Sequence, residues 1–163
     1  MLTRERRGRD GDSRAPDGVH AQPGAAILRA AMGVPVYEIS KDFLFSAAHQ
    51  IRFHPGKCER LHGHNWRIKA VLRANELATS GWVVDFNHLG AVLRALVEPY
   101  EHVFLNEVAP FDDVNPTAEN LARVIADDLA AKMDDGRVRV SRVEVWENDT
   151  CCAVYFRMPP IEG

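Results

Sequence analysis

The chain has 163 residues, of which 46% are hydrophobic and 26% charged, and this composition is that of an ordinary globular protein with one buried core. Its formal net charge of −3 excludes a generally basic surface of the kind that binds nucleic acid or anionic membranes. The sequence contains no apolar run near the roughly 20 residues that a membrane-spanning helix requires. We therefore expect neither nucleic-acid nor membrane partners.

Cysteine usage favours a reducing compartment. The three cysteines are Cys58, Cys151 and Cys152, and an odd number that includes two adjacent residues fits a disulfide framework poorly. The charged N-terminal stretch lacks the apolar region of a secretory signal. We expect a cytoplasmic protein.

Residues 1–33 differ in composition from the rest of the chain. They are rich in Arg, Gly, Asp, Ala and Pro and contain no aromatic residue, so they can bury little apolar surface. We predict a disordered tail over residues 1–33 and one folded domain over residues 34–163.

Two segments alternate between apolar and polar residues, which is typical of half-buried strands. Residues 36–49 have their apolar side chains at odd positions, and His49 ends that series. Residues 62–73 have His62, His64 and then apolar side chains at even positions, with mostly polar ones between them. Turn-forming residues 54–57 separate the two segments, so the strands can pair as a long hairpin.

Two helices are predicted after the hairpin. Asp85 is a plausible N-cap for a helix with one apolar face that ends near Pro99. The second helix begins at Asn115-Pro116-Thr117, where proline suits the first helical turn, and ends at residues 134–136. Each helix has one apolar stripe with which to cover a sheet.

Two further strands complete the domain. They are predicted at about residues 138–147 and 151–157, on either side of a turn at residues 148–150. The element order is therefore β-β-α-α-β-β. That order predicts an α+β fold in which an antiparallel sheet carries both helices on one face.

Three histidines form the strongest candidate site. His62 and His64 lie two apart on one strand, so both imidazoles leave the same face. His49 ends the preceding strand and approaches them if the two strands pair. Three neutral imidazoles with an open fourth position are typical of a catalytic zinc site. We predict that His49, His62 and His64 hold one Zn²⁺.

The spacing of Cys58, four residues before the histidine pair, leaves its role open. It can be a fourth zinc ligand that closes a structural site, a catalytic base, or a thiol without a role. Lys57 and Arg60 lie beside it in sequence, and nearby cations or a metal stabilise a nucleophilic thiolate. Cys151 and Cys152 lie in an apolar strand and are predicted to pack there, or at most to lie near a substrate.

Several short motifs occur in a fixed order between Val36 and Arg157. They are FSAAH at 45–49, CERLHGHN at 58–65, VDF at 84–86, EH at 101–102, NPTAEN at 115–120 and VWE at 145–147. This series resembles the motifs of the 6-pyruvoyl-tetrahydropterin synthase / 6-carboxytetrahydropterin synthase family. The resemblance implies the tunnelling fold (T-fold), a four-stranded antiparallel sheet with two helices on one side. It also implies assembly into a homohexamer, or a tetramer, with active sites between subunits.

The spacing of the cysteine distinguishes two branches of that family. The three residues between Cys58 and His62 resemble the bacterial 6-carboxytetrahydropterin synthases, whereas a longer insertion is similar to the animal pyruvoyl enzymes. The resemblance implies a zinc-dependent lyase that converts 7,8-dihydroneopterin triphosphate to 6-carboxy-5,6,7,8-tetrahydropterin, acetaldehyde and triphosphate, in 7-deazaguanine and queuosine biosynthesis. The alternatives are a 6-pyruvoyl-tetrahydropterin synthase, which keeps the three-carbon side chain, and a non-catalytic zinc-stabilised module.

The resemblance also implies roles for individual residues. Cys58 matches the residue that transfers protons at the side-chain carbons of the substrate, and His102 matches the second proton-transfer residue. The family places Asp before that histidine, whereas this chain has Glu101, which can orient an imidazole with one extra methylene. Glu147 matches a carboxylate that accepts hydrogen bonds from the pterin, and Thr117 is a second candidate pterin contact. Without the resemblance, Glu101, His102 and Glu147 would be interpreted as solvated surface groups.

Overall fold

The computed structural model describes residues 35–157, so the tail predicted over residues 1–33 lies outside the described residues. The strands in this part are β1 (Tyr37–His49), β2 (His62–Ala74), β3 (Val138–Asn148) and β4 (Cys151–Phe156). The helices are α2 (Phe86–Val97) and α3 (Ala118–Met133), and short 3₁₀ turns are η1 (Lys57–Glu59), η2 (Glu98–Tyr100) and η3 (Leu105–Glu107). The predicted order β-β-α-α-β-β is confirmed.

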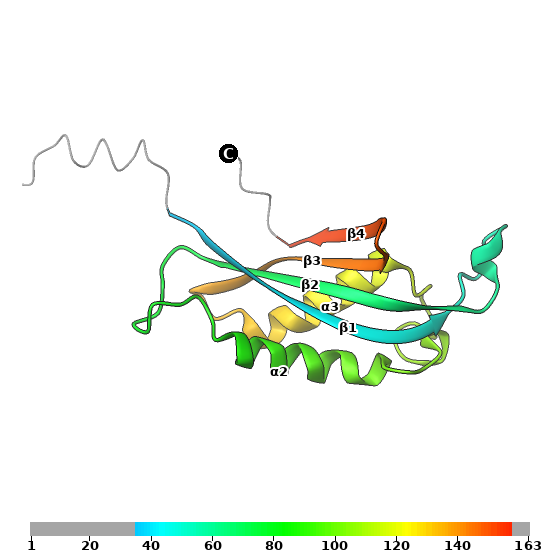
Figure 1. The fold of residues 1–163 in the computed structure, drawn as a ribbon, viewed down its shortest axis with the longest axis horizontal. Helices are drawn as coiled ribbons and strands as arrows, with labels where there is room; N and C mark the ends of the chain where they lie inside the picture. Colours follow the sequence, from blue (N-terminus) through cyan, green and yellow to red (C-terminus); the bar gives the residue numbers. More distant parts are fainter. Residues whose placement is uncertain (1–34, 158–163) are drawn as a thin grey trace, which may run out of the picture. The chain divides into compact units, whose positions relative to one another are not determined.

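The four strands form one antiparallel sheet in the order β1-β2-β3-β4. β1 and β2 make the long hairpin, whose register runs from Tyr37 opposite Ala74 to His49 opposite His62. Because side chains alternate along each strand, one face of this hairpin carries the apolar series and the other face carries the polar one. Figure 1 shows both helices against a single face of the sheet, as the sequence predicts.

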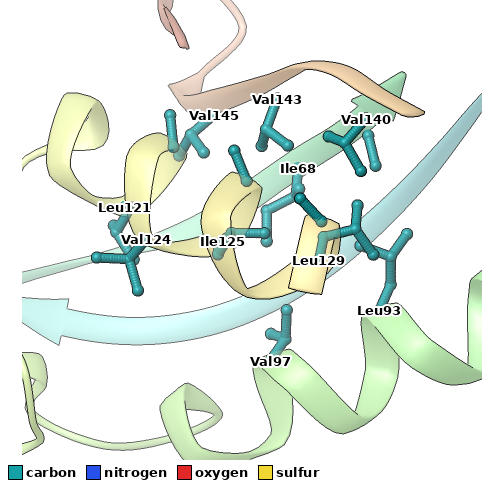
Figure 2. Packing of buried hydrophobic residues seen from close by; sticks show 14 of the residues in the cluster. Ile68, Leu93, Val97, Leu121, Val124, Ile125, Leu129, Val140, Val143 and Val145 are labelled. Carbon is teal, nitrogen blue, oxygen red and sulfur yellow. The ribbon is translucent and has the colours of Figure 1, made fainter. Parts of the chain in front are cut away.

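The hydrophobic core lies between the two helices and the apolar face of the sheet. α3 packs on β3 and β4, and α2 packs on β1 and on α3. Figure 2 shows fully buried side chains that meet in this layer, among them Ile68, Leu93, Val97, Leu121, Ile125, Leu129, Val143 and Val145. Burying one such side chain contributes roughly 1.5–3 kcal/mol, so this layer holds the helices on the sheet.

Both helices begin at capping side chains. The Asp85 carboxylate accepts a hydrogen bond from the Asn87 amide at 2.6 Å, as the sequence predicts. The Thr117 hydroxyl accepts one from the Asn120 amide at 3.2 Å. The expectation that Pro116 lies in the first turn of α3 is wrong, because Thr117 is the cap and Pro116 precedes it. Neither helix in residues 35–157 is long and apolar enough to span a membrane.

Replacing the Asp85 cap should destabilise α2 measurably. Asp85→Ala leaves the Asn87 amide without its acceptor, and the expected loss is about 1 kcal/mol of unfolding free energy. Urea denaturation followed by circular dichroism measures it. Asp42→Ala removes an exposed carboxylate from β1 and serves as the control, with an expected change below about 0.5 kcal/mol. Equal effects of the two variants would contradict the capping role.

Candidate metal and catalytic site

Three histidine rings converge where the β1–β2 hairpin opens into a loop. His49 is the last residue of β1 and lies opposite His62, the first residue of β2, and His64 follows two residues later. All three share the helix-covered face with the buried Trp66. One nitrogen from each ring lies within 4.8 Å of the others, so the cluster can hold a metal ion.

Backbone carbonyl groups orient two of these rings. His49 Nδ1 lies 2.7 Å from the Pro116 carbonyl oxygen, and His62 Nδ1 lies 2.7 Å from that of Arg60. A carbonyl oxygen accepts only, so Nδ1 of each neutral ring carries the proton and Nε2 keeps its lone pair. The Pro116 contact was not predicted, because a backbone carbonyl has no signature in a side-chain pattern.

The environment of His49 and His64 favours the neutral imidazole, the form that binds metals. Burial lowers the pKa of His49 to about 4, although its hydrogen bond to Pro116 acts in the opposite direction. Burial also lowers the pKa of His64, and the negative charge of Glu147 partly opposes that shift. Neutral rings at neutral pH offer lone pairs rather than positive charges to a cation.

Two ring nitrogens of the histidine cluster are buried without partners in the described part of the chain. Nε2 of His49 and Nε2 of His64 are inaccessible to solvent, and neither has a hydrogen-bond partner among the described residues. An unpaired buried polar atom costs about 1–3 kcal/mol, whereas a metal ion would satisfy both lone pairs. The residues present therefore fit a metal ion that binds imidazole nitrogen.

Glu147 lies near the histidines on the same face of the sheet. It is close enough to His64 for its charge to raise the pKa of that ring. It also lines a cavity of about 130 Å³ together with Ala118 and Glu119 at the start of α3 and the two adjacent cysteines of β4. The structure thus places Glu147 at a small opening beside the histidine cluster. Thr117 lies at the start of the same helix, as its cap.

Cys151 and Cys152 do not pack in the core, and the prediction that they do is wrong. Both are exposed, and β4 is the edge strand of the sheet, without a buried residue along its length. Both line the cavity at Glu147, which agrees with the alternative position near a substrate. Burial and the charge of Glu144 raise the pKa of the Cys152 thiol, so this thiol is a weak nucleophile.

Cys58 lies in the turn η1, on the loop that joins β1 to β2. Its side chain is exposed, and its thiol has no hydrogen-bond partner among residues 35–157. Its carbonyl oxygen accepts a hydrogen bond from the Ile51 amide at 2.8 Å. The loop is therefore tied to the chain that follows His49, while the thiol points to solvent.

The side chains of Glu101 and His102 contact each other beside β1. His102 Nε2 lies 3.0 Å from Glu101 Oε1, and that oxygen also accepts a hydrogen bond from the Ser46 amide at 3.3 Å. The backbone of His102 is in the left-handed region (φ 56°), and its amide donates to the Ser46 carbonyl at 2.7 Å. These hydrogen bonds hold Glu101 and His102 against β1. The two residues are therefore not a surface pair without contacts to the rest of the fold.

His102 and Glu147 line two different cavities, and His64 of the histidine cluster also lines the one at His102. His102 lines a cavity of about 590 Å³ with Ser46 and Asn65, whose side chains point away from the helices. None of the residues that line this cavity lines the smaller one at Glu147. The His102 side chain is 78% exposed.

This sheet, with two helices on one face and a histidine cluster that could hold a metal ion at the loop end of its β1–β2 hairpin, defines a small α+β protein with a candidate metal centre. The sequence matches the family described as 6-pyruvoyl tetrahydropterin synthase over residues 38–158. The chain belongs to this family.

Relatives and a solved structure agree with this assignment. The chain is 38% identical over 131 residues to the 6-carboxy-5,6,7,8-tetrahydropterin synthase of Synechocystis sp., covering 76% of this chain and 97% of the relative. It is 34% identical over 120 residues to the Bacillus subtilis protein of the same name, covering 70% and 80%. The structure of Caenorhabditis elegans 6-pyruvoyl tetrahydropterin synthase superposes with a TM-score of 0.68 at 26% identity, covering 76% of this chain and 96% of that one. The predicted T-fold is confirmed.

Proposed function

We propose that this chain is a zinc-dependent 6-carboxy-5,6,7,8-tetrahydropterin synthase of the cytoplasm. It would convert 7,8-dihydroneopterin triphosphate to 6-carboxy-5,6,7,8-tetrahydropterin, acetaldehyde and triphosphate, a step toward queuosine. The observation that carries the proposal is the three-histidine cluster with ring nitrogens within 4.8 Å of one another. It occurs in a chain that is 38% identical to a synthase of this name over nearly the whole length of that relative.

The three histidines would hold Zn²⁺ through Nε2. Once bound, the ion would supply Lewis acidity toward the hydroxyl groups of the substrate side chain. The chain keeps the ligand set ready for it, since the carbonyl groups of Pro116 and Arg60 hold the Nδ1 protons of His49 and His62. Ring orientation is therefore set before the ion arrives.

Two residues would transfer protons. Cys58 would exchange protons at the side-chain carbons of the substrate, for which a solvent-accessible thiol is suited. His102 would act as its counterpart. Because Glu101 contacts Nε2 of His102, Nδ1 is the nitrogen left to give or take a proton. The carboxylate also stabilises the charged imidazolium, as the Asp of other family members would.

Glu147 and Thr117 would recognise the pterin ring. A carboxylate has two oxygens and can accept hydrogen bonds from a ring N–H and an exocyclic amino group at once. The Thr117 oxygen already accepts from the Asn120 amide, so its hydroxyl proton is the part available to a pterin acceptor. The cavity beside Glu147 opens on the face that carries the histidines.

The active enzyme would be an oligomer, a homohexamer or a tetramer. In one chain, His102 and Glu147 line two different cavities, and a site between subunits would bring such groups to one substrate. Light scattering of the purified protein would measure the assembly. A monomer with full activity would contradict this part of the proposal.

Product identity tests the proposed reaction. The zinc-loaded protein is incubated with 7,8-dihydroneopterin triphosphate, and the products are analysed by mass spectrometry. Acetaldehyde and a pterin with a one-carbon carboxylate support the proposal. A retained three-carbon side chain would instead identify a 6-pyruvoyl-tetrahydropterin synthase, the activity named for the C. elegans structural neighbour. Zinc binding without turnover would identify a zinc-stabilised module.

A further inference from the structure

The three residues after His49 have backbone partners outside the sheet. β1 ends at His49, and the ladder of hydrogen bonds with β2 ends with it. The Gln50 amide donates to Asn106 Oδ1 at 2.9 Å, and Asn106 Nδ2 donates to the Gln50 carbonyl at 2.9 Å. One side-chain amide thus pairs with both backbone groups of a residue, as a neighbouring strand would.

Asn115 repeats this contact two residues further along. The Arg52 amide donates to Asn115 Oδ1 at 2.9 Å, and Asn115 Nδ2 donates to the Arg52 carbonyl at 3.1 Å. The two asparagines therefore hold the backbone at both ends of the segment Gln50–Arg52.

The middle of this segment is bonded to the loop of Cys58. Ile51 lies between the two residues that the asparagines hold. Its amide donates to the Cys58 carbonyl at 2.8 Å. Hydrogen bonds thus connect the two asparagine side chains, across three backbone residues, to the residue that carries the reactive thiol.

Both asparagines belong to structures that also hold the rest of the site. The Asn115 carbonyl accepts from Asn120 Nδ2 at 2.9 Å and from the Thr117 amide at 2.8 Å, which anchors it to the start of α3. The next residue, Pro116, contacts the ring of His49. Asn106 lies in η3, shortly after His102 in the chain. In Figure 1, the loop after β1 and the segment before α3 lie at the same end of the sheet.

We propose that Asn106 and Asn115 are positioning residues that set Cys58 against the three-histidine site. The proposal rests on the proposed function, in which Cys58 transfers protons. The asparagines act through the backbone of Gln50–Arg52, which joins the metal ligand His49 to the Cys58 loop. Because a reacting group displaced by about 1 Å can lower a rate about 100-fold, such a connection affects turnover more than it affects binding.

The test is a comparison of Asn106→Ala and Asn115→Ala with the full-length enzyme. We expect kcat to fall about 10- to 100-fold in each variant, with KM and zinc content nearly unchanged. We also expect faster hydrogen exchange at the Ile51 amide, since the segment that presents it to Cys58 is released at one end. Asn87→Ala, which removes an exposed amide from the start of α2, should change none of these quantities.

Asn115 lies close to Thr117, the N-cap of α3, so Asn115→Ala can also disturb the start of that helix. A milder variant of Asn115 is therefore measured together with Asn115→Ala. Asn115→Asp keeps the oxygen that accepts from the Arg52 amide and removes the donor to the Arg52 carbonyl. It should fold, and it should lower kcat by a smaller factor than Asn115→Ala. Unchanged kcat in all three variants would overturn the proposal, and so would a loss of kcat that follows zinc loss in equal measure.

A double variant distinguishes the positioning role of the asparagines from the proposed role of Cys58. If the asparagines act through Cys58, then adding Asn106→Ala to Cys58→Ala should lower the residual rate no further. A further 10-fold loss in the double variant would overturn the positioning role. If Cys58→Ala alone turned over normally, the proposed role of Cys58 would fail, whereas the Ile51 exchange rate would still show whether the asparagines hold the loop.

Discussion

The His64→Ala protein is expected to lose its bound metal while keeping its sheet. His64 Nε2 is buried without a partner, and it is one of three ring nitrogens in the cluster. Removing a group that only orients a ligand weakens metal binding about 10- to 100-fold, so removing a ligand itself should cost more than that. Zinc content after dialysis against a metal buffer measures the effect, and circular dichroism follows the sheet.

Thermal unfolding provides a second measure of the same loss. A ligand that binds the folded state alone adds about 2.7 kcal/mol of stability at 100 times its Kd, so zinc should raise the melting temperature of the unaltered protein. His64→Ala should show little or no such rise. His88→Ala, which removes an exposed imidazole from α2, is the matched control and should respond to zinc normally. Equimolar zinc retained by His64→Ala would show that the cluster is not the metal site.

The arrangement of the histidines could be predicted because it depends on local alternation. His62 and His64 must leave the same face of a strand, and the hairpin brings His49 opposite His62. The Asp85 cap and the apolar stripes of both helices could be predicted for the same reason, whereas the start of α3 was placed too early. Each of these features depends on residues within a few positions of one another, or on one antiparallel pairing.

The hydrogen bonds that support the site could not be predicted in the same way. Asn106 contacts Gln50 across 56 residues, and Asn115 contacts Arg52 across 63. An asparagine beside a turn or before a helix has a sufficient local explanation, so nothing in the sequence indicates a distant backbone partner. The left-handed backbone of His102 could not be predicted either, because it depends on a hydrogen bond from its amide to the Ser46 carbonyl in β1.

The adjacent cysteines show that an apolar sequence pattern can predict a strand without predicting whether its side chains are buried. Cys151 and Cys152 follow a turn and precede apolar residues, which favours burial in a strand. Burial also requires a layer on the other side of the strand, and β4 is an edge strand whose start is not covered. The pattern predicted the strand correctly and the environment of its first residues wrongly.

Cys58→Ala is expected to keep its zinc and lose its turnover. Sequence spacing left Cys58 equally suited to be a fourth ligand or a proton-transfer residue. In the structure its side chain is exposed, and the histidine cluster, in which His49 is buried and the other two rings are partly buried, does not include it. Loss of a general acid–base group lowers a rate by roughly 10²–10⁴-fold. Steady-state kinetics and zinc analysis of the same sample measure both quantities.

The control for Cys58→Ala should alter the same turn without removing the thiol. Glu59→Ala does this, because Glu59 is the next residue of η1 and is also exposed. We expect it to keep both zinc and turnover. If Cys58→Ala lost zinc together with activity, Cys58 would be the fourth ligand of a closed structural site, and a catalytic role for the metal would fail with it. If zinc stays and turnover disappears, Cys58 is not a metal ligand and its role in proton transfer is supported.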